Sequence, residues 1–172
     1  MSVPLENRVG QHHDVGSIEI AECSPAAADA VRLLGEFYQE QLGRYGFADP
    51  VDLDVAEFIP PRGVFAVVHR GGLAVGCGCY RWHDRVSGTI EIKKTYVSPA
   101  QRGIGAGRVL LAWLEGHAIA AGARRVILET GVRNTAARGL FTCAGYQPTP
   151  SYVPGRDPAI NRAYTRMLVE HA

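Results

Sequence analysis

A glycine-rich stretch in the second half of the chain has the composition of an anion-binding loop. Glycines at positions 103, 105 and 107 follow a strand-like run and directly precede an apolar pattern with helical spacing. Glycine weakens a helix by roughly 0.5–1 kcal/mol relative to alanine, so three at a helix start need another reason. A helix N-terminus exposes backbone N–H groups at its positive end, and phosphate is their usual ligand. The stretch therefore predicts a phosphate site, with Arg102 and Arg108 adding fixed positive charge.

Two common phosphate-binding loops do not match this stretch. A dinucleotide-binding loop needs G-x-G-x-x-G, but Arg108 stands three residues after Gly105, where its side chain would obstruct close helix–strand packing. A P-loop needs G-K-[ST] at its end, and that ending is missing here. The pattern that remains is Arg102-x-x-Gly105-x-Gly107.

This spacing resembles [RQ]-x-x-G-x-[GA], the acyl-CoA pyrophosphate loop of the GNAT superfamily of N-acyltransferases. Two other segments match in the same order: "EIKKTYVSP" (91–99) resembles the superfamily's fourth strand, and "NTAARGLFTCAGY" (134–146) resembles its N-x-x-A-x-x-[LF]-Y-x-x-x-G-[FY] helix. The match runs from about Val64 to Tyr146, and more loosely to both ends. The resemblance implies an N-acetyltransferase that uses acetyl-CoA as co-substrate and no metal.

The resemblance also implies which residues bind the cofactor. The N–H groups of the glycine loop, aided by the arginines at its ends, would cradle the pyrophosphate. The backbone of Tyr96 and Val97 would pair with the pantetheine arm as if it were an added strand. This works in the superfamily because the fourth and fifth strands splay apart, and Asn134 borders the resulting cleft. The implied cofactor residues are Tyr96, Val97, Arg102, Gly103, Ile104, Gly105, Ala106, Gly107, Arg108, Asn134 and Phe141.

Amine acetylation benefits from a base, and Glu91 is the first candidate. A primary amine with a pKa of about 10.4 is neutral to only about one part in a thousand at pH 7. Glu91 lies six residues before Val97, which matches the general-base glutamate of those superfamily members that use one. Partial burial would raise the pKa of Glu91 towards the working range. The alternative is a surface glutamate paired with Lys93, and a bulge in the strand would alter the alternation of its side chains.

Glu129 and Val97 are the other catalytic candidates. Glu129 lies on the next strand, in "LETG", where it could act as the base or orient the acceptor amine. Its alternative is an ordinary hydrogen-bonded group at a strand end. The backbone N–H of Val97 would meet the negative charge that develops on the thioester oxygen. We expect direct attack in a ternary complex, where the orientation of two bound substrates supplies much of the acceleration.

Phe141 departs from the superfamily pattern, which commonly has a tyrosine there as general acid. A phenyl ring can pack on the pantetheine arm but can donate no proton. Tyr146, Tyr152, Tyr164 or a water would have to replace it. Alternatively, the thiolate could leave without help, since a thiol pKa of about 8.5 makes it a tolerable leaving group.

The acceptor itself is not readable from the sequence. The superfamily builds its acceptor pocket from the early helices, the end of the third strand and the late hairpin. Neither an acidic cluster nor a basic groove is evident, so a small amine, an amino acid or a peptide N-terminus remains open. The aromatic candidates, which could equally be core residues, are Phe37, Tyr38, Tyr45, Phe47, Tyr80, Trp82 and Tyr152, and of these we select Tyr38, Tyr80, Trp82 and Tyr152 as substrate-binding residues.

The order of predicted elements must position these residues. Alternating polarity indicates strands, helical spacing indicates helices, and Gly71-Gly72 joins two strands in a tight hairpin. The predicted strands lie at 17–23, 63–70, 73–83, 88–97, 124–132 and 162–170, and the helices at 26–42, 52–59, 103–121 and 134–144. This order predicts an α/β fold, a GNAT-like mixed central sheet with splayed fourth and fifth strands flanked by helices. We expect a flexible N-terminal segment at 1–16 and a single N-acetyltransferase domain at 17–172.

Composition limits the partners. The 172 residues carry a formal net charge of +1, with no long run of like charge and no apolar run near the ~20 residues that span a bilayer, so we expect neither nucleic-acid nor membrane binding. The polar first residues do not look like a signal peptide. Cys77 and Cys79 have no second Cys/His cluster to form a zinc site, and we expect all four cysteines to be reduced and buried in a cytoplasmic protein. Dimers are common among proteins of this type, so a homodimer is an open expectation.

Three functions are compatible with these residues. The preferred one is an N-acetyltransferase that acts on a primary amine of a small molecule, amino acid or peptide. The second, which Phe141 motivates, is a non-catalytic acyl-CoA-binding or sensor module. The third is a nucleotide-binding protein that uses the loop for another phosphate.

Overall fold

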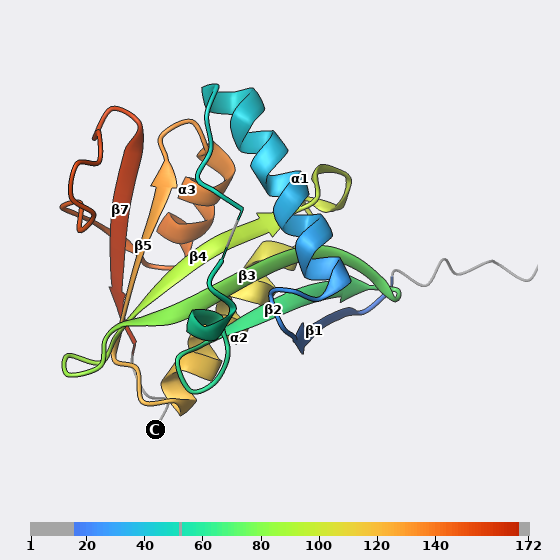
Figure 1. Cartoon of the computed structure of the whole chain (residues 1–172), viewed down its shortest axis with the longest axis horizontal. Helices are drawn as coiled ribbons and strands as arrows, with labels where there is room; N and C mark the ends of the chain where they lie inside the picture. The colour runs from blue at the N-terminus through green and yellow to red at the C-terminus, as the bar shows by residue number, and fades with distance from the viewer. Residues whose placement is uncertain (1–15, 52, 169–172) are drawn as a thin grey trace, which may run out of the picture.

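The centre of the molecule is one seven-stranded sheet. A computed structural model describes residues 16–51 and 53–168. The strands are β1 (Ile18–Glu22), β2 (Gly63–Arg70), β3 (Leu73–Asp84), β4 (Thr89–Val97), β5 (Arg125–Gly131), β6 (Gln147–Thr149) and β7 (Asn161–Met167). Their order across the sheet is β1-β2-β3-β4-β5-β7-β6, and only β4 and β5 run parallel (Figure 1). The predicted mixed sheet is confirmed.

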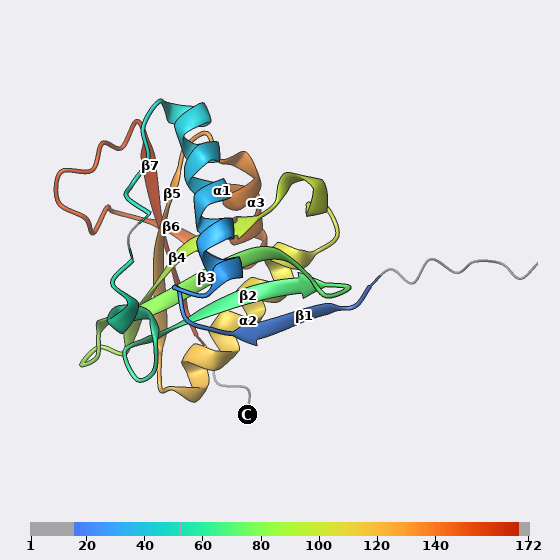
Figure 2. The ribbon, with the colours of Figure 1, turned by 45° about the vertical axis from the view of Figure 1, so that its right-hand side comes forward.

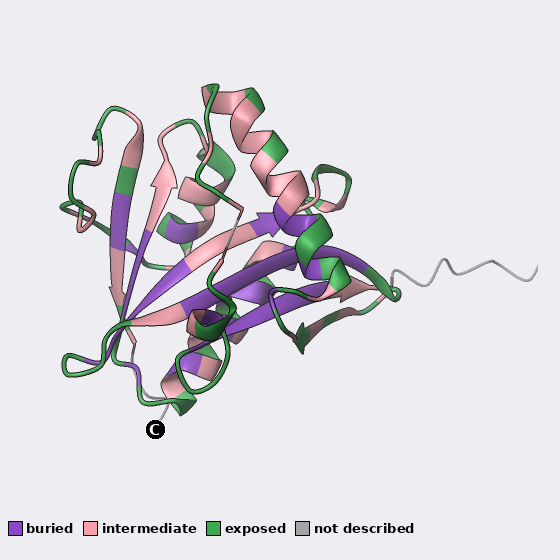
Figure 3. Cartoon of the chain, viewed as in Figure 1, coloured by how far each residue is buried: buried purple, intermediate pink, exposed green. Residues whose placement is uncertain are grey.

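Helices cover both faces of this sheet. They are α1 (Ala28–Tyr45), α2 (Ala106–Ala120) and α3 (Thr135–Cys143), with short 3-10 helices at Val55–Phe58 and Pro99–Gln101. Leu33 of α1 and Phe58 pack in one apolar cluster with Phe65 of β2. Leu110 of α2 and Phe141 of α3 pack in the other. Figure 2 shows α1 and α2 on opposite sides of the strands, and Figure 3 shows the buried residues concentrated where helices meet the sheet.

The observed boundaries differ from the predicted ones mainly at helix ends. The first helix runs on to Tyr45, where Gly46 ends it in a left-handed conformation with φ of +78°. The segment predicted as a helix at 52–59 forms a 3-10 helix of one turn at Val55–Phe58, N-capped by Asp54. The helix predicted from residue 103 begins at Ala106, because Gly103 and Gly105 have left-handed φ values that a helix cannot contain. Strand β6 lies in a proline-rich segment that gave no strand signal.

Parts of the remaining predictions lie outside the described residues. The flexible segment predicted at 1–16 falls there except for Gly16, and so does the end of the strand predicted at 162–170. The single-domain assignment stays a prediction. Within 16–51 and 53–168, no helix combines the length and apolarity needed to cross a bilayer.

The predicted splay between β4 and β5 is present. The two strands pair from Thr89 and Arg125 to Ile92 and Leu128, and the pairing ends there. Strand β4 nevertheless continues to Val97 and β5 to Gly131. Figure 1 shows the two strands diverging beyond this point. The backbone edge of the last residues of β4 therefore has no neighbouring strand on that side.

A β-bulge lies in β4 just beyond the point where the splay begins. Cys77 of β3 pairs with Tyr96, but Cys79 pairs with Lys93, so β4 has one extra residue between these pairs. Lys94 adopts a φ of +56°, the left-handed value that marks this kind of bulge. The bulge reverses the alternation of side chains: Ile90 and Ile92 pack with α2, whereas Tyr96 packs with α1.

Two buried thiols support the bulge. The thiol of Cys79 donates to the carbonyl of Lys93 at 3.3 Å, and the thiol of Cys77 lies 3.7 Å from the carbonyl of Lys94. Both cysteines are fully buried, whereas Cys23 is half-buried and Cys143 is exposed, so the prediction that all four cysteines are buried was wrong for these two. All four thiols are free. The described residues contain no group of three or more His, Cys, Asp or Glu that could hold a metal ion.

Candidate active site

The glycine loop forms the N-terminal end of α2 and presents free backbone donors. Gly103 and Gly105 have φ values of +83° and +88°, which L-residues with a side chain rarely adopt. No acceptor within the described residues receives the backbone N–H of any residue from Gly103 to Arg108. The N–H groups of Gly103, Gly105, Ala106, Gly107 and Arg108, at the positive end of a helix, are thus available to a ligand, which fits the pyrophosphate of an acyl-CoA.

These donors face a cleft of about 360 Å³ between the loop, β4 and the start of α3. The cleft brings together nine of the predicted cofactor residues, which are Tyr96, Val97, Arg102, Gly103, Gly105, Ala106, Gly107, Arg108 and Asn134. Ile104 does not line the cleft, and its side chain is exposed. Phe37, Leu110 and Leu140 supply apolar walls. The cleft thus combines a polar end at the loop with an apolar interior, as a nucleotide with a long aliphatic arm requires.

The two arginines of the loop differ in availability. Arg102 donates from Nε to the carbonyl of Val97 at 2.9 Å and from its guanidinium to Glu40 of α1, so it ties the loop to β4 and α1. Arg108 is exposed, lines the cleft and forms no hydrogen bond or ion pair within the described part of the chain. Arg108 is therefore the free cation beside the loop, whereas Arg102 is mainly a clamp.

The free edge of β4 is formed by Val97. The N–H of Ser98 donates to Val75 of β3 at 2.8 Å, and successive N–H groups of a strand point to opposite sides. The backbone of Val97 therefore faces the edge that β5 has left. Tyr96 pairs with Cys77, and its carbonyl lies against Gly76 of β3. The expectation that the Tyr96 backbone pairs with the pantetheine arm was wrong, because that backbone is engaged within the sheet; its side chain lines the cleft instead.

A second, polar cavity of about 100 Å³ adjoins the cleft. Phe37, Thr95 and Asn134 line both spaces, so the two meet at these residues. The side chain of Asn134 also caps α3 by accepting from the N–H of Ala137 at 3.2 Å, which fixes its position. Charged side chains from α1, β4, β5 and the segment after β6 line the polar cavity. The anion-binding loop thus lies in the cleft, whereas the adjoining polar cavity has charged walls that suit a polar second substrate.

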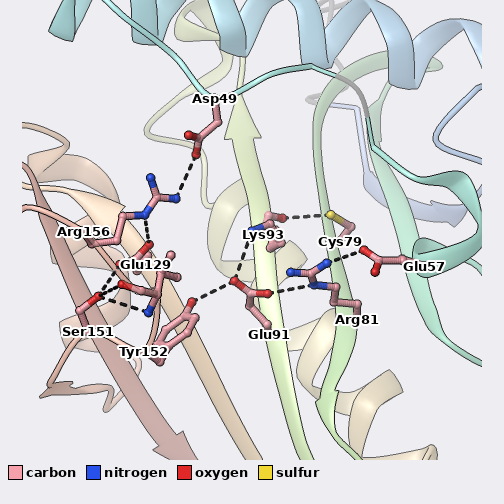
Figure 4. A network of polar contacts seen from close by, with 11 residues as sticks. Asp49, Glu57, Cys79, Arg81, Glu91, Lys93, Glu129, Ser151, Tyr152 and Arg156 are labelled. Atoms are coloured by element: carbon pink, nitrogen blue, oxygen red, sulfur yellow. Dashed lines mark hydrogen bonds and ion pairs between the residues drawn. The ribbon is translucent and has the colours of Figure 1, made fainter.

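Glu91 lines the polar cavity in a network of donors (Figure 4). Its carboxylate accepts from Arg81 at 3.0 Å, Lys93 at 3.2 Å and Tyr152 at 3.1 Å, and its side chain is only 5% exposed. Burial by itself would raise the pKa of Glu91, but the charges and hydrogen bonds of Lys93 and Arg81 outweigh it and lower the pKa below its ordinary value. The predicted rise in pKa was therefore wrong. The predicted pairing with Lys93 is present, although Glu91 is buried and not a surface residue.

Glu129 lies across the same cavity on β5. One carboxylate oxygen accepts from Arg156 at 3.0 Å and the other from Ser151 at 3.2 Å. Arg156 also bridges to Asp49 at 3.4 Å, and all of these groups belong to segments far apart in the chain. The structure thus brings the two candidate carboxylates to one cavity, each with its own positively charged partner.

The three tyrosines that could replace a tyrosine at position 141 lie outside the linings of the cleft and the polar cavity. Phe141 is 2% exposed and packs against Tyr146 and Tyr164; it lines the polar cavity and not the cleft. Tyr146 donates to Glu115 at 2.7 Å, and the oxygen of Tyr164 accepts from Arg138. Tyr152 donates to Glu91, and burial, followed by the negative charge of Glu91 and that hydrogen bond, raises its pKa.

The four aromatic residues predicted to bind the acceptor lie at different distances from the polar cavity. Tyr152 does not line the polar cavity but donates to Glu91, which does. Tyr38 lines a neighbouring recess beside Lys94. Trp82 lies in a separate recess under the Arg85 guanidinium, 4.9 Å from its ring centre. Tyr80 packs with α2 on the opposite face, where its hydroxyl pairs with His117 at 2.8 Å and burial raises its pKa to about 12. The structure therefore corrects Tyr80 to a core residue and places Trp82 outside both spaces.

Sequence reasoning missed several polar residues of the cavity wall and its supports, among them Asp49, Arg81, Lys94 and Arg156. Arg81 and Glu91 lie on adjacent strands, and only the strand register brings them together. Arg156 and Asp49 lie in segments without regular structure and gave no signal. Lys94 could have been found, because two adjacent lysines interrupt the alternation of "EIKKTYV" where the bulge occurs.

Comparisons with known proteins agree with this architecture. A family model for the Acetyltransferase (GNAT) family matches residues 27–146. The chain is 34% identical over 148 residues to an IAA acetyltransferase of Azospirillum brasilense, a match that covers 83% of this chain and 93% of that protein. Among solved structures, a Klebsiella pneumoniae protein assigned as an acyl-CoA N-acyltransferase superposes with a TM-score of 0.76 at 27% identity, covering 88% of this chain and 98% of that one.

A further solved structure, yncA of Salmonella typhimurium with its cofactor acetyl-CoA, has a TM-score of 0.64 at 22% identity over 91% of this chain and 96% of that one. This likeness concerns the fold. The family match, the curated relative and the glycine loop with its free donors lead to one assignment. The chain belongs to the GNAT family of acetyltransferases and is an acyltransferase enzyme.

Proposed function

We propose that this enzyme transfers the acetyl group of acetyl-CoA to a primary amine by direct attack in a ternary complex. The observation that carries the proposal is the set of N–H groups of Gly103, Gly105, Ala106, Gly107 and Arg108, which have no acceptor among the described residues. These residues line a cleft that extends to Val97 at the free edge of β4. Arg108 would add charge at the pyrophosphate, and Leu110 and Leu140 would pack on the pantetheine arm. That cofactor is bound by a fold neighbour, yncA.

Bound acetyl-CoA would supply a thioester carbonyl for attack. The N–H of Val97 faces the free edge of β4, where it would donate to the carbonyl oxygen as negative charge develops on it. Phe37, Thr95 and Asn134 mark the junction of cleft and polar cavity, and thus the place where the two substrates would meet. Holding both substrates there would supply much of the acceleration.

Glu91 is the proposed proton acceptor, directly or through a water. Its lowered pKa keeps the carboxylate ionised at neutral pH, which makes it a weak base towards a free ammonium group. The N–H of the amine becomes much more acidic as its lone pair forms the new C–N bond, so a weak base suffices at that stage. Glu129, across the cavity, would orient the incoming acceptor. Its ammonium form loses one proton to solvent before attack, and Glu91 takes the second proton as the C–N bond forms. We propose that the thiolate leaves without a protein acid, because Tyr146 and Tyr152 donate their protons to Glu115 and Glu91, and Tyr164 lines neither the cleft nor the polar cavity.

Two-substrate kinetics test the proposal. Thiol release is measured while acetyl-CoA and an amine are varied together, and direct attack predicts intersecting double-reciprocal lines. Glu91→Gln is expected to lower kcat by about 10²-fold or more, the usual range for a general base. Glu19→Gln, at an exposed position of β1, removes one carboxylate as a control and should leave kcat unchanged. Parallel lines, or full activity of Glu91→Gln, would contradict the proposed mechanism.

A further inference from the structure

The charges that line the polar cavity leave one cation without a partner. Four basic side chains face this space, Arg44, Lys93, Lys94 and Arg156, against three carboxylates, Asp49, Glu91 and Glu129. Arg44 pairs with Glu40 of α1 at 2.8 Å. Lys93 pairs with Glu91, and Arg156 pairs with both Glu129 and Asp49. Lys94 has no carboxylate within 4.0 Å and no hydrogen bond from its ammonium group to any of the residues that the structure describes.

The bulge in β4 is what puts Lys94 at this place. Its φ of +56° interrupts the alternation of the strand, so Lys93 and Lys94 both line the cavity although they are neighbours in sequence. The ammonium group lies 6.0 Å from the ring centre of Phe37, at the junction with the cleft. A backbone conformation that L-residues rarely adopt is thus used at the point where the two substrates would meet.

Partial burial of an ammonium group without a counter-ion costs desolvation free energy, and the neighbouring charges offset this cost only in part. Burial lowers the pKa of Lys94, and the charge of Asp49 opposes that shift only in part. Asp49 is already bonded to Arg156 at 3.4 Å. An anionic group of a ligand would give Lys94 the partner that it lacks within the described chain.

We infer that the acceptor carries a carboxylate beside its amine, and that Lys94 binds this carboxylate while the amine faces Glu91. Such an acceptor is a free α-amino acid or a close analogue, whose two groups are a few bonds apart and suit a cavity of about 100 Å³. A peptide N-terminus has no carboxylate at that distance, and a polyamine would bring a second cation towards Lys94. The inference rests on the proposed function and narrows its substrate class.

The test compares each proteinogenic amino acid with its own α-carboxamide as acceptor in the thiol-release assay. For the best amino acid, we expect kcat/KM to exceed that of the amide by about 10-fold or more, the ratio expected for one charge-assisted hydrogen bond. Lys94→Met should remove this preference by raising KM for the acid only, and Lys94→Arg should keep most of it. Arg125→Met, at an exposed position at the start of β5, controls for the loss of one positive charge.

A binding measurement separates failure of this inference from failure of the proposed function. The N-acetyl amino acids and their amides are titrated into the enzyme saturated with coenzyme A. Tighter binding of the acids, lost in Lys94→Met, supports the inference even if no amine is acetylated. Equal binding and equal turnover of acids and amides, or a preference that survives Lys94→Met, overturns it while leaving amine acetylation intact.

Discussion

At the scale of single residues, the most informative side chain is Glu91. Three donors surround its carboxylate, and the pKa stays low despite burial. A raised pKa is the usual way to prepare a carboxylate as a general base. Glu91 instead keeps a fixed negative charge at the cavity, which attracts an ammonium group. The neutral amine is the form that attacks, and Glu91 can take a proton from its nitrogen as the new C–N bond forms.

Glu91→Gln is expected to make the free energy of unfolding depend less on pH between neutral and acidic conditions. The folded-state pKa lies below the unfolded value of about 4.3, so the ionised carboxylate stabilises the fold above that pH, and this contribution is lost as pH falls through the folded pKa. Glutamine does not titrate and so has no such contribution. At neutral pH the variant should lose about 1–3 kcal/mol, since Arg81 and Lys93 are partly exposed and keep water.

Urea unfolding from about pH 7 to about pH 3 measures this effect. Glu19→Gln, which removes an exposed carboxylate of β1, is the matched control and should follow the wild type. If the stability of Glu91→Gln fell with pH in parallel with that of the wild type, the ionised carboxylate of Glu91 would not be the group that stabilises the fold.

Residue types predicted the anion-binding end of the site better than the acceptor end. Arg102, Gly105 and Gly107 lie close together in sequence, so their spacing alone carries the signal. The partners of Glu91 come from β3 and from the segment after β6. Hydrogen bonds between distant segments depend on register and loop course, and neither can be read from residue types.

At the scale of elements, the bulge in β4 connects the C-G-C sequence of β3 to the active site. The thiols of Cys77 and Cys79 lie against the carbonyls of the bulge residues, and Gly78 between them leaves room for Leu110 and Leu114 of α2. The bulge in turn sets the direction of Lys94 and Tyr96. The C-G-C pattern, which did not predict a metal site, thus complements an irregular strand.

Cys79→Ala is expected to destabilise the protein by about 1–3 kcal/mol, because it leaves a small cavity and removes the donor to the Lys93 carbonyl. The KM for the acceptor should rise more than the KM for acetyl-CoA, since the bulge faces the polar cavity. Urea unfolding and steady-state kinetics measure the two effects. Cys143→Ala, at an exposed position of α3, should stay within about 0.5 kcal/mol of the wild type. Equal effects of the two substitutions would contradict a supporting role for Cys79.

The loop before α2 gives a second prediction at this scale. Gly105 has a φ of +88°, so Gly105→Val forces a β-branched residue into a conformation that it strongly disfavours. The N–H groups of the loop would turn away from the ligand, and the Kd for acetyl-CoA should rise about 10-fold or more. Calorimetric titration measures this change.

Gly116→Ala provides the control within the same helix. A Cβ at Gly116 meets nothing within 4 Å, and the residue has an ordinary helical φ. Its acetyl-CoA affinity should be unchanged, and its stability should rise by about 0.5–1 kcal/mol. An unaltered affinity in Gly105→Val would mean that the loop does not hold the cofactor.

Element order was predictable because hydrophobic periodicity and turn residues are local signals. The exceptions have physical causes. The segment at 52–59 winds into a single 3-10 turn, and β6 is a three-residue strand held by β7 and not by its own propensity. Neither depends on a periodic pattern of its own.

At the scale of the whole molecule, the fold separates the tasks of the site. The splay of β4 from β5 opens the sheet, with the glycine loop of α2 at one end of the opening and the charged cavity at the other. Segments from α1, β3, β4, β5 and the stretch after β6 contribute side chains to the charged end. The resemblance to the GNAT superfamily predicted the splay and the loop, which the shared backbone determines. The charged wall consists of side chains particular to this chain, so its character emerged only from the structure.

The most direct test of the account follows the acetyl group itself. The enzyme is mixed with acetyl-CoA labelled in the acetyl group and with an amine acceptor, quenched at intervals, and both protein and amine are analysed by mass spectrometry. The account predicts labelled amide formed mole for mole with free coenzyme A, and no label on the protein at any time. Label attached to the protein before the amine, or coenzyme A released without labelled amide, would contradict direct transfer.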